Sequence, residues 1–140
     1  MLDRSVKKPL LAKADVTAPS LTYAIELQLI AAQVGFDWPD IKGVVDKINE
    51  ELLEVLAEIE PPDNHARLKD EIGDLLFACT NLARHLNIDP EQALQEGNQK
   101  FYDRFTMLEQ LASANGRDIS DHSLEQLEQL WYRVKQDSNR

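Results

Sequence analysis

The sequence predicts an all-α protein, a helical bundle of about five helices. After about residue 19, apolar residues recur at three- and four-residue steps, which is the period of a helix that buries one face. Pro, Gly, Asn and Asp residues form short connections between these segments, and no stretch reads as a credible strand. Amphipathic helices joined by short turns are typical of an all-α bundle.

The length and charge of the chain narrow its class. Its 140 residues fit one domain, and a hydrophobic share of 43% is ordinary for a globular protein. A formal net charge of −10 argues against binding to nucleic acid or to an anionic membrane surface, because such binding requires clustered Lys and Arg. No signal peptide is visible, and the apolar stretch from Leu21 to Val34 is short and carries Glu26. We therefore expect a cytoplasmic protein with no nucleic-acid and no membrane partner.

The N-terminal part of the chain divides at about residue 18. Residues 1–18 lack a sustained period, so we expect a flexible arm without chemistry there and a single helical domain over residues 19–140. Pro19–Ser20 offers the start of the first helix, and its apolar-rich segment stops near Gly35.

Two longer amphipathic helices follow in the sequence. Asp40 suits the N-cap of the first, whose apolar stripe runs from Ile41 to Ile59 and ends at Pro61–Pro62. Asp63 or Asn64 can cap the next helix, which runs to about residue 86. Its apolar run includes Cys79, which has no disulfide partner in the chain, and we expect this residue in the core.

The last two helices have clear start signals. Asp89–Pro90–Glu91 supplies an N-cap, a proline at the first helical position and an acid in the first turn. That helix runs to the region of Asn115–Gly116. Ser123 with Gln126 resembles a capping box, and apolar residues as far as Val134 define the final helix.

Two acidic pairs on neighbouring predicted helices carry the chemistry. Glu51 and Glu54 lie three residues apart, as do Glu71 and Asp74, so each pair shares one helix face. One acidic helix face is ordinarily just solvated, but two facing pairs in a bundle favour a metal site. Carboxylates without histidine or cysteine suit Mg²⁺, or Mn²⁺ in its place, rather than Zn²⁺.

Several cationic and aromatic residues have two interpretations each. Lys100 and Arg104 lie four residues apart on one helix face, which fits a phosphate or two surface charges. Lys47, one turn before the first acidic pair, fits a phosphate or an i,i+4 ion pair. Trp131 and Lys135 fit a core aromatic with a solvated lysine, or a stacking platform with a phosphate contact.

Taken together, five motifs resemble those of the MazG nucleoside triphosphate pyrophosphohydrolases. They are Lys47-Ile48-x-Glu50-Glu51-x-x-Glu54, Glu71-x-Gly73-Asp74, Asn81-Leu82-Ala83-Arg84, Asn98-x-Lys100-Phe101-x-x-Arg104-Phe105 and Trp131-x-x-Val134-Lys135. The resemblance covers about Leu21 to Gln136, includes Gly35-Phe36-Asp37-Trp38, and is nearest to the C-terminal catalytic half of the two-domain members.

The resemblance implies an all-α, metal-dependent enzyme that hydrolyses nucleoside triphosphates to the monophosphate and pyrophosphate, usually as a homodimer or higher homo-oligomer. The implied Mg²⁺ ligands are Glu51, Glu54, Glu71 and Asp74, and the implied nucleotide contacts are Lys47, Lys100, Arg104, Trp131 and Lys135. In this interpretation Lys100 and Arg104 also offset negative charge in the transition state, and Glu50 is a candidate for the base that orients the attacking water.

Two other functions fit the same residues. One is a dUTP or dCTP pyrophosphatase of the same superfamily, since the carboxylates do not fix the base and a stacking Trp tolerates every ring. The other is a non-catalytic helical interaction module whose acidic face binds a basic partner.

Overall fold

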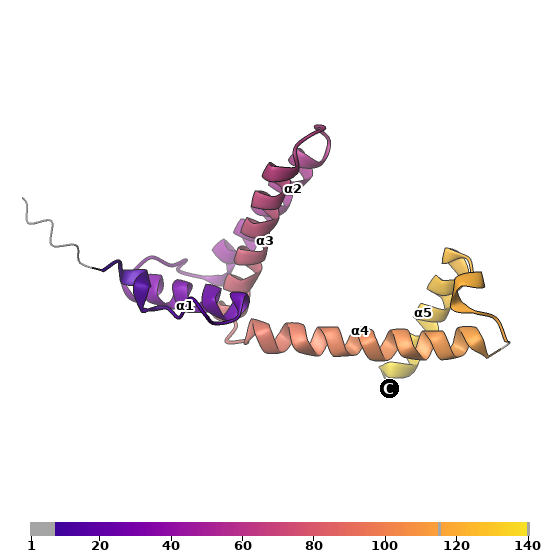
Figure 1. Ribbon diagram of the computed structural model, residues 1–140. Helices are drawn as coiled ribbons and strands as arrows, with labels where there is room; N and C mark the ends of the chain where they lie inside the picture. The colour runs from indigo at the N-terminus through magenta and orange to yellow at the C-terminus, as the bar shows by residue number, and fades with distance from the viewer. Residues whose placement is uncertain (1–7, 115, 140) are drawn as a thin grey trace, which may run out of the picture. The chain divides into compact units, whose positions relative to one another are not determined.

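The computed structural model describes residues 8–114 and 116–139, and within those ranges the regular structure is entirely helical (Figure 1). The elements are η1 (Leu10–Lys13), α1 (Ser20–Gln33), α2 (Ile41–Ile59), α3 (His65–His85), α4 (Pro90–Ser113), η2 (Ile119–Asp121) and α5 (Leu124–Ser138). The predicted all-α class is confirmed, and each of the five predicted helices is present near its expected position. No helix in the described ranges has the length and apolar character that crossing a membrane requires.

The chain divides into two compact units, Met1–Glu91 and Gln92–Arg140. The first contains η1, α1, α2, α3 and the first residues of α4, and the second contains the rest of α4 with η2 and α5. Residues 10–13, part of the segment expected to form a flexible arm, form the short helix η1, which packs on α1. The expected arm extends to residues 1–7, which lie outside the described residues. The single domain expected over residues 19–140 stays a prediction.

The end of α1 turns the chain toward α2 through a glycine. Gly35 has a φ of +89°, in the left-handed region that glycine adopts without penalty. Its N–H donates to the carbonyl of Ala32 at 3.0 Å, and the N–H of Phe36 donates to that of Ala31 at 3.1 Å. This pair of bonds satisfies the last carbonyls of the helix and fixes the direction of the loop that follows.

The first turn of α2 is fixed by its cap and by an aromatic ring. The Asp40 side chain accepts from the Gly43 N–H at 3.2 Å, as the sequence predicted for an N-cap. A β-carbon added at Gly43 would lie 3.2 Å from Cε3 of Trp38, so the glycine lets the indole lie close against this turn.

Helices α2 and α3 form an antiparallel hairpin, and α1 packs on α3 (Figure 1). Val44, Val55 and Ala78 are buried in this unit. The prediction that Cys79 lies in the core is wrong, because its side chain is exposed. Successive helical residues point about 100° apart, so when Ala78 faces inward the next residue along α3 turns away from the packed seam.

The second unit is built on α4 and α5. Leu108, Ala112 and Val134 are buried, and the Phe101 and Trp131 rings lie with their centroids 5.6 Å apart. The predicted capping box at the start of α5 is confirmed. The Ser123 hydroxyl accepts from the Gln126 N–H, and the Gln126 side chain accepts in return from the Ser123 N–H.

Candidate functional site

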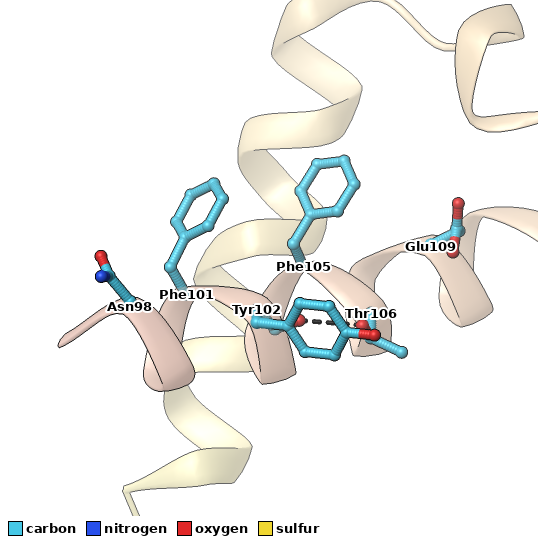
Figure 2. A pocket seen from close by; sticks show the side chains of 6 residues that line it. All are labelled: Asn98, Phe101, Tyr102, Phe105, Thr106 and Glu109. Atoms are coloured by element: carbon cyan, nitrogen blue, oxygen red, sulfur yellow. Dashed lines mark hydrogen bonds between the residues drawn. The ribbon is translucent and has the colours of Figure 1, made fainter. Parts of the chain in front are cut away.

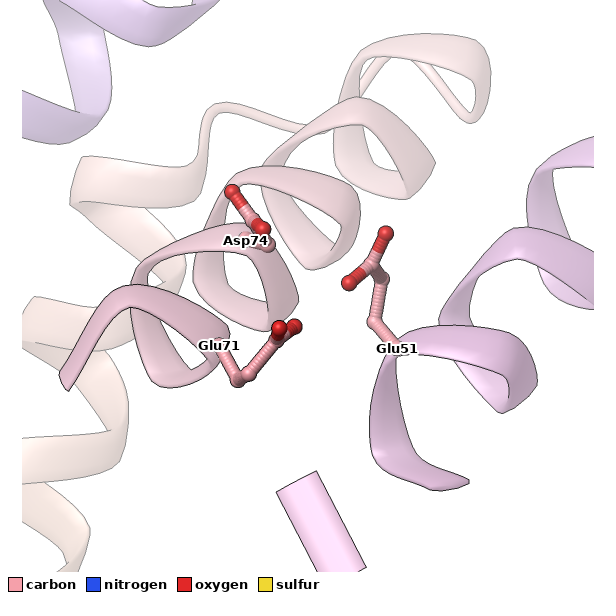
Figure 3. Close-up of side chains that lie close together, drawn as sticks. All are labelled: Glu51, Glu71 and Asp74. Atoms are coloured by element: carbon pink, nitrogen blue, oxygen red, sulfur yellow. The ribbon is translucent and has the colours of Figure 1, made fainter. Parts of the chain in front are cut away.

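Three of the four predicted metal ligands converge between α2 and α3. Glu51 projects from α2, while Glu71 and Asp74 project from α3, and Figure 3 shows their carboxylates pointing toward one another. One carboxylate oxygen from each residue lies within 4.8 Å of the other two. That spacing is small enough for one cation to touch all three groups.

These acidic residues lie opposite each other because they are about equally far along α2 and α3 from the turn of the hairpin. Glu51 lies eight residues before the end of α2 at Ile59, and Asp74 lies nine residues after the start of α3 at His65. Because both helices rise by the same amount per residue, positions equally far from the turn of an antiparallel pair lie opposite each other. Glu54 and Glu71, five and six residues from the same helix ends, meet for the same reason.

The cluster contains buried oxygens that no protein group satisfies. Glu51 is only 5% exposed, and Lys47 Nζ lies 2.9 Å from its Oε1. Its other oxygen, Oε2, and Oε2 of Glu71 are both buried without a hydrogen-bond partner in the part of the chain that the structure describes. A buried anionic oxygen without a partner is costly, so these atoms point to a ligand that is a cation or a donor.

The surroundings raise the pKa values of two carboxyls in the cluster. The neighbouring Glu71 carboxyl, with the negative charge of Glu51, raises the pKa of Glu54 to about 7. Burial, together with the charges of Asp70 and Glu51, raises the pKa of Asp74, and Lys47 counteracts this in part. Glu54 is therefore electrostatically part of the cluster, although it lies outside the three-residue group at 4.8 Å.

The donor set fits a hard divalent cation. All the converging ligand atoms are carboxylate oxygens, and the cluster contains two buried oxygens without a partner. The neighbouring Glu71 carboxyl raises the pKa of Glu54, and burial raises that of Asp74, with nearby negative charges adding to both shifts. A divalent cation would satisfy the free oxygens and remove the repulsion, and oxygen-only ligands suit Mg²⁺ or Mn²⁺.

A cavity of about 780 Å³ adjoins the carboxylates within the first unit. Glu51, Asp74 and Lys47 contribute to its wall. The rest of the lining is largely apolar and aromatic, with Trp38 and Phe77 as two of its rings. A volume of this size, with apolar and aromatic walls and several polar groups, is typical of a small-molecule site.

A network of polar side chains closes part of this cavity. The Arg84 guanidinium donates to both carboxylate oxygens of Asp37, at 2.6 and 3.1 Å, and His85 Nε2 lies 2.9 Å from Asp37 Oδ1. Arg84 also donates through Nε and Nη2 to Asn81 Oδ1, at 3.0 and 2.7 Å. The Arg84 hydrogen bonds lower the pKa of Asp37 to about 2. This network ties the loop after α1 to the C-terminal half of α3.

The remaining predicted nucleotide contacts belong to the second unit. Lys100 and Lys135 are exposed, and Trp131 packs against Phe101. Arg104 donates to Ser138 Oγ at 3.1 Å and to Asn139 Oδ1 at 3.3 Å, so its guanidinium holds the end of α5. The exposed face of α4 also has an open concavity of about 440 Å³, formed by one helix (Figure 2). Its lining residues are Asn98, Phe101, Tyr102, Phe105, Thr106 and Glu109.

Comparisons of the sequence with known proteins point to one family. Residues 40–106 match the family described as the MazG nucleotide pyrophosphohydrolase domain. The chain is 42% identical over 117 residues to a nucleoside triphosphate pyrophosphohydrolase/pyrophosphatase MazG of Thermotoga maritima, and 44% identical over 118 residues to a nucleoside triphosphate pyrophosphohydrolase of Escherichia coli. The chain belongs to the MazG family. The matched segment runs through α2 and α3 into α4, so it contains all four predicted metal ligands.

The extent of these matches differs between the chain and its MazG relatives. Both alignments cover 84% of this chain, but only 44% and 45% of the Thermotoga maritima and Escherichia coli proteins. The uncharacterized protein YabN of Bacillus subtilis is 43% identical over 81 residues, which is 58% of this chain and 16% of that protein. The chain thus spans less than half the length of the curated relatives it matches.

Several residues of the MazG cavity were not assigned a role from the sequence. Gln28, Asp37 and Trp38 line it from α1 and the following loop, and Asn81 and Arg84 line it from α3. One signal was available for Gln28. It is a polar residue in the middle of an apolar-rich helical segment, and it is the one α1 residue that is fully buried in the structure.

The raised pKa of Glu54 leads to a prediction about metal binding. Because Glu54 must lose its proton to bind a cation and its pKa is about 7, we expect Mg²⁺ affinity to rise about tenfold from pH 6 to pH 8. Calorimetric titration in two buffers of different ionisation enthalpy would measure the affinity and the released proton. Glu54→Gln should remove most of this pH dependence, and a wild-type affinity independent of pH would contradict the assignment.

The raised pKa of Glu54 also predicts how the stability of the metal-free protein changes with pH. Because the folded protein holds this proton more tightly than the unfolded chain, protonation of Glu54 stabilises the folded state. This contribution is complete below pH 4.5, the pKa of the carboxyl in the unfolded chain, and it is lost as the pH rises through about 7. In the presence of a chelator, the wild-type melting temperature should therefore fall between pH 5 and pH 8 relative to that of Glu54→Gln.

Proposed function

We propose that this chain hydrolyses nucleoside triphosphates to the nucleoside monophosphate and pyrophosphate, with Mg²⁺ as its cation. The observation that carries the proposal is the carboxylate cluster, with its two buried, unpartnered oxygens, opening onto a cavity of about 780 Å³. The names of the Thermotoga maritima and Escherichia coli relatives support the same activity.

In this proposal the cation is held by four carboxylates, those of Glu51, Glu54, Glu71 and Asp74. When bound, Mg²⁺ would supply Lewis-acid charge neutralisation on phosphate oxygens and lower the pKa of a bound water. The protein fixes where that charge is placed. Lys47 binds one oxygen of Glu51, at 2.9 Å, and leaves the other facing the cluster.

Lys47 has a second role in the proposal. Its ammonium lies at the boundary between the carboxylates and the cavity, where it can neutralise phosphate charge. Glu50, 57% exposed and 3.4 Å from Lys47 Nζ, remains our candidate for orienting the water. Both acids contact the same lysine, so movement of Lys47 toward a phosphate would release Glu50 as well as Glu51.

Four residues of the second unit are further candidates for nucleotide contacts. We assign Lys100, Arg104 and Lys135 to phosphate groups and keep Trp131 as a candidate nucleotide contact. For Arg104 this requires exchange of its bonds to Ser138 and Asn139 for phosphate oxygens, which are stronger acceptors for a guanidinium.

Product analysis tests this proposal. Purified protein is incubated with each common NTP and dNTP plus Mg²⁺, with and without EDTA, and the products are separated chromatographically. Monophosphate and pyrophosphate formed only with the metal would support the activity, and a turnover limited to dUTP or dCTP would favour the base-restricted enzyme. Diphosphate and phosphate, or no turnover, would contradict the proposal, and a basic partner bound in EDTA would then favour the interaction module.

We also propose a homodimer or higher homo-oligomer. Leu53, Leu56 and Leu76 on the α2–α3 hairpin are 66%, 51% and 56% exposed, and apolar side chains exposed in this number mark interaction surfaces. Light scattering coupled to size exclusion should give at least twice the chain mass of 15.9 kDa, and the mass of one chain would contradict this. The cytoplasmic location expected from the sequence stays a prediction.

A further inference from the structure

Gln28 presents a buried acceptor that the protein does not use. The residue is 7% exposed, lies on α1 and lines the cavity beside the carboxylates. Its Nε2 donates to the backbone carbonyl of Phe77 at 3.2 Å. A carbonyl can only accept, so the amide orientation is fixed with Oε1 as the free end. No group in residues 8–114 or 116–139 donates to that oxygen.

An unpartnered buried amide oxygen is unfavourable by about 1–3 kcal/mol and is rare in folded proteins. It points to a donor from a bound molecule. Gln28 Oε1 has less than 1 Å² of accessible surface, so a ligand reaches it after a side-chain adjustment in the cavity wall, which commonly accompanies binding.

Asn81 presents the complementary group from α3. Its Oδ1 accepts two bonds from Arg84, which is itself held by Asp37. Because a guanidinium can only donate, this arrangement fixes the amide with Nδ2 as the free end. Nδ2 has no acceptor among the described residues, and Asn81 also lines the cavity. Asn81 lies one helical turn after Phe77 on α3, and the Phe77 carbonyl holds the Gln28 amide from α1. The two amides are therefore anchored to neighbouring turns of α3.

The cavity wall also suits a flat ring. Trp38 and Phe77 are 45% and 48% exposed, although large aromatic side chains normally bury their faces. Exposed aromatic rings beside the carboxylate cluster are suited to stacking on a nucleobase.

We propose that this cavity takes the nucleoside part of the substrate, and that Gln28 Oε1 and Asn81 Nδ2 bind a donor and an acceptor on it. The inference rests on the proposed function, because it takes the ligand of the carboxylates to be a nucleotide. The donor is an N–H of the base or an O–H of the sugar. Gln28 and Asn81 are therefore specificity-determining residues, and the carboxylates are not.

Binding of α,β-imido analogues of the eight common NTPs and dNTPs, measured by calorimetry with Mg²⁺, tests the assignment. Gln28→Met keeps the length of the side chain and removes its polar atoms. We expect this variant to weaken binding of at least one analogue about tenfold, the effect of losing one hydrogen bond in a buried site. Asn81→Ala should weaken binding of the same analogues, and it leaves the Arg84–Asp37 pair in place.

Thr80→Val is the matched control. Thr80 is a buried polar residue on α3 that also donates to a backbone carbonyl, that of Leu76 at 2.9 Å, but it does not line the cavity. This variant should bind all eight analogues as the wild type does. Equal affinities within twofold for wild type, Gln28→Met and Asn81→Ala, each with a cooperative thermal transition, would overturn the inference.

Two further experiments are needed. One tells whether the sugar or the base supplies the hydrogen-bond donor, and the other separates the nucleoside assignment from the proposed activity. If the loss in Gln28→Met disappears with 2′,3′-dideoxy analogues, the donor is a sugar hydroxyl. If it disappears with analogues whose base N–H groups are methylated, at the ring nitrogen of uracil, thymine and guanine or fully at the exocyclic amino group of adenine, cytosine and guanine, the donor is the base. Wild-type hydrolysis with no effect of either variant on binding overturns the nucleoside assignment alone. Binding that depends on Gln28, without release of pyrophosphate from natural substrates, overturns the proposed activity alone. Absence of binding to all eight analogues overturns the assignment.

Discussion

Asp74→Asn is expected to abolish turnover, lowering kcat by at least about 10³-fold, because a proposed cation ligand in the carboxylate cluster becomes a neutral amide. The carboxylates concentrate negative charge that a divalent cation offsets, so each contributes to holding that cation against the phosphates. Initial rates of pyrophosphate release at saturating Mg²⁺ measure the effect. Ala at Glu54 or Asp74 should give the same loss.

Asp46→Asn is the matched control for this result, because Asp46 is an exposed acid on α2 outside the cluster, and it should leave turnover within about twofold. A second measurement separates a metal site from a structural one. In EDTA, Asp74→Asn should melt at a higher temperature than the wild type, since it removes repulsion from the empty cluster. Near-normal turnover of folded Asp74→Asn would show that the metal assignment is wrong.

Asp37→Asn is expected to destabilise the fold by about 2 kcal/mol, because it leaves the Arg84 guanidinium without its charged partner. The Arg84 side chain is only 11% exposed, so water replaces the lost pairing poorly. Denaturant titration measures the change, and a fall of about 5 °C in melting temperature should accompany it.

Arg67→Ala is the control, since its contact with Glu58 is 3.9 Å long and the Arg67 side chain is 78% exposed. It should change stability by less than about 0.5 kcal/mol. Because the pKa of Asp37 is lowered from 3.8 to about 2, its contribution is complete above pH 4 and is lost as the pH falls toward 2. Equal stability losses for Asp37→Asn and Arg67→Ala would contradict a structural role for the Asp37–Arg84 pair.

Local signals predicted the helices well. Asp40 and the Ser123–Gln126 pair appear as caps in the structure because a cap depends on a few consecutive residues. Asn64 shows the limit of such signals. It stands at the N-cap of α3, but its side chain donates to the carbonyl and carboxylate of Glu58 across the turn, and no side-chain cap bond forms. A competing partner six residues away decided the outcome.

The carboxylates could be predicted because their spacing and the proline-containing turn together determine which faces meet. The cavity could not. Gln28, Asp37 and Asn81 come from three segments, and only the packing of α1 on α3 brings them to one wall. The apolar pattern of α3 also led to the wrong prediction that Cys79 is buried. Such a pattern predicts which face of a helix is apolar, but not how much of that face a neighbouring helix covers.

The α2–α3 hairpin sets how the site tolerates insertions and deletions. The number of residues between each carboxylate pair and the turn sets which way the pair faces. One residue added between Glu54 and Ile59 would therefore rotate Glu51 and Glu54 by about 100° relative to α3. Residues added within the turn at 60–64 leave both helical registers unchanged. Among homologues of this chain, length variation should therefore accumulate at the tip of the hairpin and be excluded from the two helical turns on either side of it.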